Sequence, residues 1–390
     1  MSGPRVRVGL ERVAAERPEW LDARVGAVVH PASVDGTLRH AVDVLLDAGF
    51  GLQALFGPQH GARGEKQDNM IESDHYADPV TGLPVHSLYS DVRKPTPEML
   101  DGLDVVLFDL QDVGVRVYTF VWTMALVMEA CAEAGVEVVI LDRPNPVGCV
   151  QREGAVLKPG FESFVGLHPV PLRHGLTAGE LARWLNTERE IGCTLHVVEC
   201  TGLTREMRWL DTGLPFVMPS PNLPTVTSCD VYPGMVLFEG TNLSEGRGTT
   251  RPFELFGAPW LDADALVREA TPRIGSGVVL RPAYFEPTFQ KHAGAMCGGA
   301  QLHVTDLETF EPVRAAVGIL CAARRLAPND FAWRNPPYEY EEVLPPIDIL
   351  WGSSELRTGV DSGLEPDEIM SGDPEEIAAF EASIAPYLLY

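Results

Sequence analysis

The sequence predicts an α/β fold, with a mainly parallel, doubly wound sheet followed by a smaller α+β domain. Short apolar runs alternate with helical patterns over the first 200 residues. The runs are apolar almost throughout, as in strands that are buried on both faces of a parallel sheet. Polar side chains gather where these runs end, and the carboxyl ends of parallel strands form the ligand crevice of such sheets. These three observations predict the fold class and the place of the first functional residues.

Each element of the first half has its own signature. The predicted strands end in polar or turn residues, and the predicted helices repeat apolar residues at helical spacing. Gly49 and Gly135 stand where two helices should end. In chain order we expect a strand at 25–33, a helix at 37–49, strands at 52–61 and 104–114, a helix at 119–135, a strand at 136–148, a helix at 177–188 and a strand at 194–200.

Two segments interrupt this alternation. Residues 62–98 are rich in polar and turn-forming residues and show little periodicity, which is more typical of a lid or binding loop than of a linker without function. The segment MPSPNLPT (218–225) breaks all periodicity and predicts a domain boundary nearby. We therefore expect an N-terminal domain at 1–228 and a smaller domain at 229–390. Within the second domain, AQLHVTD predicts a strand and EPVRAAVGILCAARRLAP a helix.

Composition narrows the class of partner. Thirty basic and 55 acidic side chains give a formal charge of −25, which argues against nucleic acid or an anionic membrane as the main partner. A few arginines can still bind a small anion locally. Seven scattered cysteines without a CxxC pair fit neither a disulfide framework nor a zinc ribbon. No segment reads as a secretory signal or a membrane span, so the cytoplasm is the expected compartment.

The densest group of charged residues lies in LFEGTNLSEGRGTTRPFELFGAP. This stretch holds Glu239, Glu245, Arg247, Arg251 and Glu254 among four glycines. Glycines let a backbone approach a ligand closely, and an arginine pair can hold a carboxylate or sugar oxygens. The alternative is a solvated loop whose charges pair with each other. The apolar flanks favour a site.

A second candidate is FDLQDVGVRVYT, where a predicted strand ends in Asp109 and Asp112 follows three residues later. Phosphohydrolases with a similar motif need aspartates two residues apart, so one is nucleophile and the other acid on the same loop. Gln111 fills that position, which disfavours a phosphatase. Asp109 as a simple cap of the next helix is the structural alternative.

A third candidate is FGPQHGARGEKQ, which places His60, Arg63 and Glu65 beside the predicted sheet edge. Its glycines match neither a P-loop nor a dinucleotide fingerprint, so phosphate and nucleotide binding are disfavoured. A histidine after a strand is as often structural as catalytic. LDRPNPVG adds Asp142 and Arg143 in a loop made rigid by two prolines.

A metal site is disfavoured by the spacing of the histidines. FVGLHPVPLRHG, MPSPNLPT and PTFQKHAG contribute His168, Arg173, His174, Asn222 and His292. None of the histidines stands in an HxH or HExxH pattern, which would place two of them on one metal ion.

These segments, together with TGLPVHSLYS and KPTPEML, resemble a bacterial family that was once a domain of unknown function and is now associated with exo-β-N-acetylmuramidases of the NamZ type. The motifs follow one another in order over about residues 25–305. The resemblance implies a Rossmann-like N-terminal domain, an active cleft between it and the C-terminal domain, and no nucleotide cofactor. The implied reaction removes non-reducing terminal N-acetylmuramic acid (MurNAc) from peptidoglycan fragments such as MurNAc-GlcNAc during cell-wall recycling. The family pattern has glutamate where this chain has Gln59.

Glycosidases usually use two carboxyl groups, one protonated and one ionised. Glu245 is our first choice for general acid/base, because Leu243 and Gly246 offer it a partly apolar setting. Asp109 is expected to position or activate water, and the substrate's N-acetyl group is an alternative nucleophile. The expected catalytic residues are Glu245, Glu239, Asp109, Glu65 and His60. The expected substrate-binding residues are Gln59, Arg63, Asp112, Arg116, Tyr118, Arg143, Asn222, Arg247, Arg251 and His292, and one arginine among Arg116, Arg247 and Arg251 is expected to bind the lactyl carboxylate of muramic acid.

Two other functions stay open at this point. A metal-assisted hydrolase would use Asp109, Asp112 and histidines. A muropeptide-binding module without turnover is made more plausible by Gln59, because an amide cannot transfer a proton. The sequence leaves open whether hydrolysis retains or inverts configuration, whether a peptide stem is tolerated, and the oligomeric state.

Overall fold

A seven-stranded sheet organises the N-terminal part of the chain. The computed structural model describes residues 5–16, 18–64 and 74–390, and its sheet has the order β3-β4-β2-β1-β5-β6-β9. Neighbours from β4 to β9 run parallel, whereas β3 pairs antiparallel with β4. The strands are β1 (Arg24–Val28), β2 (Gly51–Gly57), β3 (Tyr76–Ala77), β4 (Pro84–Ser87), β5 (Val105–Phe108), β6 (Glu137–Leu141) and β9 (Leu195–Val198).

Helices cover both faces of this sheet. In β5, Val105 and Leu107 belong to one buried core, while Val106 and Phe108 belong to the other. Helices α1 and α2 pack into the first core, and α4 and α5 into the second. The arrangement is mixed α/β with a largely parallel sheet, and it fits Rossmann-like folds in general. These helices are α1 (Gly9–Glu16), α2 (Ala41–Ala48), α3 (Pro97–Leu100), α4 (Phe120–Ala134) and α5 (Ala178–Glu188), with the short 3₁₀ helices η1 (Glu19–Asp22) and η2 (Trp209–Thr212).

The predicted helix ends follow from their cap residues. Gly49 ends α2 with φ 92°, and Gly135 ends α4 with φ 68°, a left-handed backbone that glycine adopts without strain. Helix α5 begins with a capping box, because the Thr177 side chain accepts from the Glu180 backbone and the Glu180 carboxylate accepts from the Thr177 backbone. The three helices are confirmed, although α2 begins at Ala41, later than the predicted start at residue 37.

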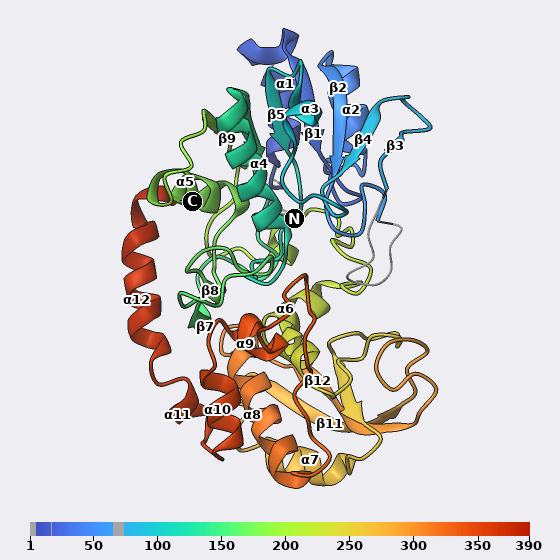
Figure 1. The fold of residues 1–390 in the computed structure, drawn as a ribbon, viewed down its shortest axis with the longest axis vertical. Coiled ribbons are helices and arrows are strands. Elements are labelled where there is room, and N and C mark those ends of the chain that lie inside the picture. Colours follow the sequence, from blue (N-terminus) through green and yellow to red (C-terminus); the bar gives the residue numbers. More distant parts are fainter. Residues whose placement is uncertain (1–4, 17, 65–73) are drawn as a thin grey trace.

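The C-terminal part is smaller and of α+β type (Figure 1). Its antiparallel sheet has the order β10-β12-β11, formed by β10 (Leu255–Ala258), β11 (Val278–Phe285) and β12 (Cys297–Val304). The predicted strand lies in β12 and the predicted helix in α8. None of the described helices has the length and apolar character that crossing a bilayer requires. The helices are α6 (Val226–Met235), η3 (Val236–Gly240), α7 (Ala263–Ala270), α8 (Pro312–Leu326), α9 (Pro346–Trp351), α10 (Glu355–Asp361), α11 (Pro366–Ile369), α12 (Asp373–Ile384) and η4 (Ala385–Tyr387).

The chain crosses between the two parts twice. It first enters α6, within which the predicted boundary at 228/229 falls. It returns along α12, which packs against β7 (Glu153–Val156), the partner of β8 (Pro171–Arg173) in a small second sheet of the N-terminal part. Figure 1 shows α12 running back to the region of α5.

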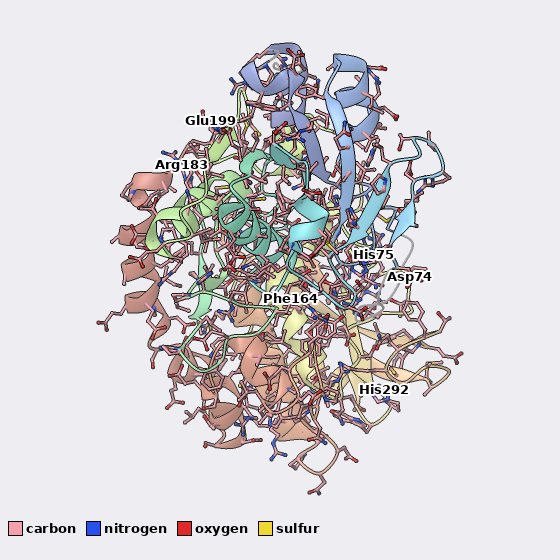
Figure 2. The ribbon with its side chains drawn as sticks, turned by 45° about the horizontal axis from the view of Figure 1, so that its top comes forward. Asp74, His75, Phe164, Arg183, Glu199 and His292 are labelled. Atoms are coloured by element: carbon pink, nitrogen blue, oxygen red, sulfur yellow. The ribbon has the colours of Figure 1, made fainter. Side chains whose placement is uncertain are left out.

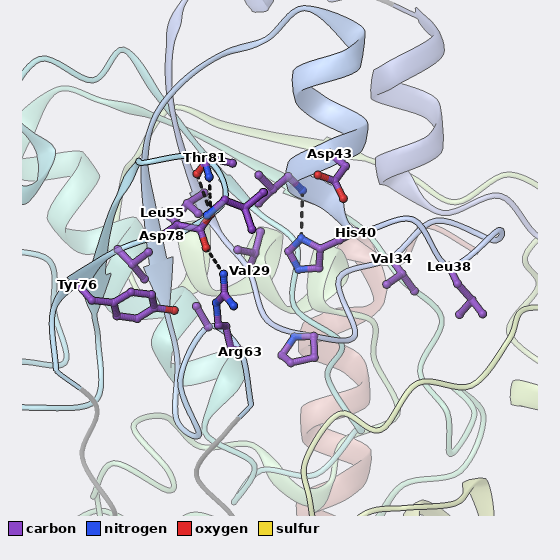
Figure 3. A pocket seen from close by; sticks show the side chains of 15 residues that line it. Val29, Val34, Leu38, His40, Asp43, Leu55, Arg63, Tyr76, Asp78 and Thr81 are labelled. Carbon is purple, nitrogen blue, oxygen red and sulfur yellow. Dashed lines mark hydrogen bonds and ion pairs between the residues drawn. The ribbon is translucent and has the colours of Figure 1, made fainter.

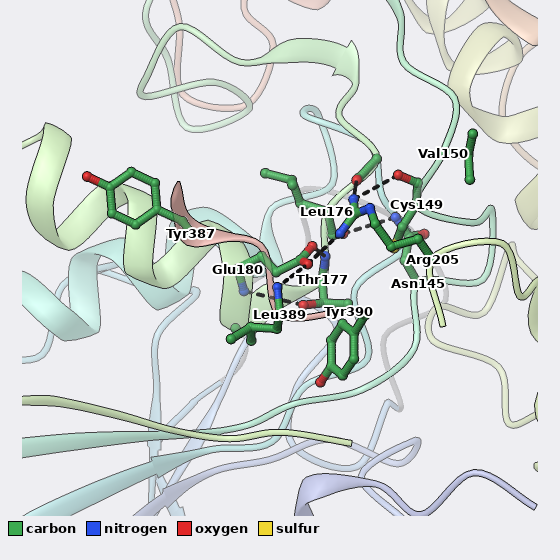
Figure 4. A network of polar contacts seen from close by, with 12 residues as sticks. Asn145, Cys149, Val150, Leu176, Thr177, Glu180, Arg205, Tyr387, Leu389 and Tyr390 are labelled. Carbon is green, nitrogen blue, oxygen red and sulfur yellow. Dashed lines mark hydrogen bonds and ion pairs between the residues drawn. The ribbon is translucent and has the colours of Figure 1, made fainter. Parts of the chain in front are cut away.

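The returning segment is fastened to the N-terminal part by polar contacts (Figure 4). The backbone N–H of Leu389 donates to Glu180 Oε1 at 2.9 Å, and Arg205 Nη1 donates to the same oxygen at 2.5 Å. The hydroxyl of Tyr390 donates to Asp142 Oδ2 at 2.7 Å. The last two residues of the chain therefore share a polar network with Asp142, Glu180 and Arg205 of the N-terminal part.

Candidate active site

A cavity separates the carboxyl edge of the large sheet from the C-terminal part. Its volume is about 30 Å³, within a hollow of about 400 Å³ that includes open solvent. The loops after β2 and β5 contribute Gln59, His60, Tyr118 and Thr119 to its wall. The C-terminal part contributes Tyr232, Glu239, Arg247, Tyr338 and Glu339.

Arg247 lies between two buried carboxylates. Its Nη2 donates to Glu239 Oε1 at 2.7 Å, and its Nε lies 3.3 Å from Glu245 Oε1. Lys291 Nζ donates to Glu245 Oε2 at 2.9 Å. Two nitrogens of Arg247 are buried and have no hydrogen-bond partner among the described residues: Nε, which has only the ion-pair contact with Glu245, and Nη1. Because an unsatisfied buried donor costs roughly 1–3 kcal/mol, an acceptor on a ligand at Nη1 would stabilise the site.

Glu239 is the ionised carboxylate of the cavity. Its Oε2 accepts a hydrogen bond from Tyr338 Oη at 2.6 Å, while its Oε1 accepts from Arg247. Burial acts to raise the pKa of Glu239, but the charge and hydrogen bond of Arg247 and the Tyr338 hydroxyl outweigh it and hold the pKa below its ordinary value. The carboxylate therefore stays charged at neutral pH.

Glu339 is a second carboxyl group in the same wall, with the opposite behaviour. It accepts from Tyr89 Oη at 2.7 Å and from Gln59 Nε2 at 3.2 Å. Burial, with a further contribution from the Glu239 charge, raises the pKa of Glu339 to about 7, although Tyr89, Gln59 and Arg247 act to lower it. Two carboxyl groups whose environments move their pKa values apart are the arrangement expected of an acid and its ionised partner.

Five residues predicted from the sequence line this cavity: Gln59, His60, Tyr118, Glu239 and Arg247. His60 Nε2 lies 3.3 Å from the hydroxyl of Ser220, which also lines the cavity, and Tyr118 Oη donates to the carbonyl of Pro219 at 2.7 Å. The loop after β2, the loop after β5 and the segment at 218–225 thus meet at one place.

Asp109 and Arg143 form a closed pair outside the cavity wall. Arg143 Nε and Nη2 donate to the two oxygens of Asp109 at 2.7 and 2.8 Å, and Nη1 donates to the carbonyl of Val34 at 3.0 Å. Both side chains are buried. Asp112 also lies outside the wall, where its Oδ2 accepts from the Gly114 backbone at 2.7 Å.

The other predicted arginines are occupied elsewhere. Arg116 is fully buried, and its guanidinium donates to the carbonyls of Ala155, Val170 and Leu350 at 2.7–2.9 Å. Arg63 pairs with Asp78 at 2.6 Å and Arg251 with Glu254 at 3.3 Å. None of these three arginines borders the cavity.

Glu245, Asn222 and His292 also stand back from the cavity wall. We expected a partly apolar setting for Glu245, but the structure gives it two cations, Arg247 and Lys291. The His292 ring nitrogen Nε2 lies 2.7 Å from the carbonyl of Asn242, and Figure 2 shows His292 over the C-terminal part, away from Phe164 near the centre. Glu65 lies outside the described residues.

The sequence reasoning missed Glu339, Tyr338, Tyr89 and Lys291. Glu339 stands in the acidic, aromatic run PPYEYEE, which reads as a solvated surface turn. The partners that reveal it are distant in the sequence, since Gln59 is 280 positions away. The two prolines before the turn were the available signal for a rigid loop.

A larger hollow of about 1050 Å³, on the same measure, lies against the other core of the sheet (Figure 3). Its wall is mostly apolar. Among its charged residues, Arg63 and Asp78 pair with each other, and Asp43 lines it as well. Within the described residues, no three His, Cys, Asp or Glu side chains lie close enough together to hold a metal ion.

Comparison with known proteins places the chain in a family. The family models described as exo-β-N-acetylmuramidase NamZ match residues 25–227 for the N-terminal model and 230–390 for the C-terminal model. The chain belongs to the NamZ exo-β-N-acetylmuramidase family. The resemblance stated from the motifs is confirmed.

Relatives support the same assignment over the full length. The chain is 43% identical to the peptidoglycan β-N-acetylmuramidase NamZ of Bacillus subtilis (strain 168), over 99% of this chain and 92% of that protein. Two solved DUF1343 family proteins of Bacteroides fragilis NCTC 9343 are similar in fold. One has a TM-score of 0.90 at 34% identity and the other 0.78 at 30% identity, each covering 99% of both chains.

Proposed function

We propose that this protein is an exo-β-N-acetylmuramidase, a glycosidase that releases non-reducing terminal MurNAc from peptidoglycan fragments such as MurNAc-GlcNAc. Membership of the NamZ family and the activity named for the Bacillus subtilis relative support this proposal. The cavity supports the proposal as well, because it holds one ionised carboxylate, Glu239, and one carboxyl group with a raised pKa, Glu339.

The observation that carries the proposal is the unpartnered Nη1 of Arg247. MurNAc differs from N-acetylglucosamine by a lactyl carboxylate, and a guanidinium nitrogen is a strong donor to such an anion. Arg247 and Lys291 balance the charges of Glu239 and Glu245. An anionic sugar therefore meets a locally neutral cluster although the whole chain carries a formal charge of −25.

The other residues predicted from the sequence have supporting roles in this proposal. Gln59, His60 and Tyr118 line the cavity and are placed to contact sugar hydroxyls, whereas Glu245 acts on substrate through its pairing with Arg247. For Asp109 we retain the water-positioning role as a hypothesis that its pairing with Arg143 makes weaker. The metal-assisted alternative loses support for the same reason, since both Asp109 oxygens accept hydrogen bonds from Arg143.

We further propose a doubly wound sheet, domains at 1–228 and 229–390, and action in the cytoplasm on recycled wall fragments. Helices on both faces of the sheet support the first, and the two family models support the second. All seven cysteines are buried and unpaired, which agrees with a reducing compartment.

The test is to incubate the purified protein with MurNAc-GlcNAc, with and without EDTA, and to follow released sugar. We expect release of MurNAc that EDTA leaves unchanged. GlcNAc-GlcNAc, which lacks the lactyl group, is the matched control and should be cleaved much more slowly. Loss of activity with EDTA would support the metal-assisted alternative, and binding of MurNAc-GlcNAc without release would support a muropeptide-binding module.

A further inference from the structure

A strained turn carries one carboxyl group into the cavity. Tyr338 and Glu341 exchange both backbone hydrogen bonds at 2.9 Å, and between them Glu339 and Tyr340 have φ of 45° and 68°. Neither residue is glycine, and a left-handed backbone costs roughly 1–2 kcal/mol for each such residue. A turn of this kind persists where its surroundings fix it, often at a functional site.

A chain of hydrogen bonds fixes the carboxyl group of Glu339. Thr119 Oγ1 donates to Gln59 Oε1 at 2.8 Å, so the amide of Gln59 turns its NH₂ toward Tyr89 Oη at 2.9 Å and Glu339 Oε1 at 3.2 Å. Tyr89 then donates its own hydroxyl proton to Glu339 Oε2 at 2.7 Å. The N-terminal part thus orients a side chain that the C-terminal part supplies.

This inference rests on the proposed function and assigns its proton donor. We propose that Glu339 is the general acid of the reaction and that Gln59 and Tyr89 are positioning residues for it. The Glu339 proton passes to the glycosidic oxygen as the bond between that oxygen and C1 breaks, and the electron pair of the bond stays on the departing sugar. Water forms the new bond to C1, and the proton it loses returns to the Glu339 carboxylate.

The electrostatic setting agrees with this role. The titratable and charged groups that face Glu339 are Tyr89, Tyr232, Glu239, Arg247 and Tyr338. Burial is the largest influence and raises the pKa of Glu339 to about 7, so that much of the population keeps its proton near neutral pH. Gln59 acts in the other direction on the pKa, because its donated hydrogen bond stabilises the ionised carboxylate, so its role is to orient Glu339.

The first test compares Glu339→Gln with the wild type on two substrates. On MurNAc-GlcNAc, whose leaving oxygen needs a proton, we expect kcat/KM to fall by about 10²–10⁴. On the dinitrophenyl β-glycoside of MurNAc, whose leaving group departs without a proton, kcat/KM should stay within about threefold. Glu342→Gln, an exposed carboxylate in the same segment, is the matched control and should leave both values unchanged.

An equal loss on both substrates, or none on MurNAc-GlcNAc, would overturn the assignment of Glu339 while leaving the proposed function intact. A wild-type protein that cleaves neither substrate would instead remove the proposed function. Binding of MurNAc to each variant by calorimetry shows that the cavity is folded.

The second variant keeps the carboxyl group and removes its hydrogen-bond donor. The Tyr89 hydroxyl lowers the pKa of Glu339, so Tyr89→Phe should move the basic limb of the kcat/KM profile on MurNAc-GlcNAc to higher pH, by about one unit. A purely structural role for Tyr89 would lower the rate without moving the limb. An unmoved limb therefore counts against Glu339 as the acid.

Discussion

Two buried arginine–carboxylate clusters, Asp109–Arg143 and Glu239–Arg247–Glu245, look alike in composition and differ in how completely they are satisfied. All three nitrogens of the Arg143 guanidinium donate hydrogen bonds, two of them to Asp109 and one to the carbonyl of Val34. Arg247 pairs with the carboxylates of Glu239 and Glu245, and its Nη1 still has no hydrogen-bond partner among the described residues. Every guanidinium nitrogen of the first cluster thus donates to an acceptor of the protein, whereas the arginine of the second cluster lines the cavity with a donor left over. An unpartnered donor in the wall of a cavity is what separates the second cluster from the first.

The largest effect is expected from opening the closed pair. Arg143→Met leaves the Asp109 carboxylate buried without a cation, and removing one partner of such a pair costs about 3–5 kcal/mol of unfolding free energy. Urea unfolding of the variant measures the loss. The double variant Asp109→Asn/Arg143→Met removes both charges and should recover most of the stability. If the double variant also cleaves MurNAc-GlcNAc at the wild-type rate, Asp109 takes no part in the mechanism.

A smaller effect is expected from changing the open cluster without removing its charge. Arg247→Lys keeps a cation between Glu239 and Glu245 but lacks the third nitrogen that a ligand carboxylate would use. We expect KM for MurNAc-GlcNAc to rise by about 10- to 100-fold, which is about 1.4–2.7 kcal/mol. Arg251→Lys, at the half-exposed arginine of the same stretch, is the control. Equal KM values for the two variants would contradict the role of Arg247.

The smallest effect on catalysis is expected at a group outside the cavity, which tests whether a raised pKa alone marks the site. Burial raises the pKa of Glu153, outside the cavity, to about 7. The unfolded chain gives up this proton near its ordinary, lower pKa, so folding stability falls as the pH rises from about 4.5 through about 7. Glu153→Gln should flatten this fall by roughly 2–3 kcal/mol while leaving kcat/KM unchanged. Thermal unfolding at pH 5 and pH 8 measures the first effect, and a change in kcat/KM would contradict the second.

The sequence predicted where the parallel strands begin and where the helices end, because the causes are local. Apolar runs, helical spacing and cap residues such as Gly49 and Thr177 act within one or two turns of the chain. The predicted strands at 104–114 and 136–148 run past the ends of β5 and β6, because the loops that follow are buried as well. Strand β4 was not predicted, since Pro84–Ser87 is short and lies in a segment without periodicity. Its pairing with β2 is a tertiary contact that the segment's own pattern does not encode.

The site was predicted in part for the same reason. Glu239 and Arg247 stand out because charged residues among apolar ones are locally odd. Glu339 does not stand out, because its burial depends on a left-handed turn and on Gln59 and Tyr89 from the other part of the chain. Glu245 looked suited to acid chemistry from its neighbours in sequence, but Lys291 approaches it from 46 positions away.

The return of α12 to the N-terminal part also limits how the molecule can deform. The two parts are joined covalently at α6 and again through α12, and residues 389–390 are bonded to Glu180 and Asp142. A single linker would leave the parts free to twist and bend in every direction. Two connections favour one relative motion of the two parts, a rotation about the line that joins the connection at α6 to the connection at α12. Any widening of the cavity that admits a disaccharide while keeping both connections is therefore a hinge movement with a fixed axis.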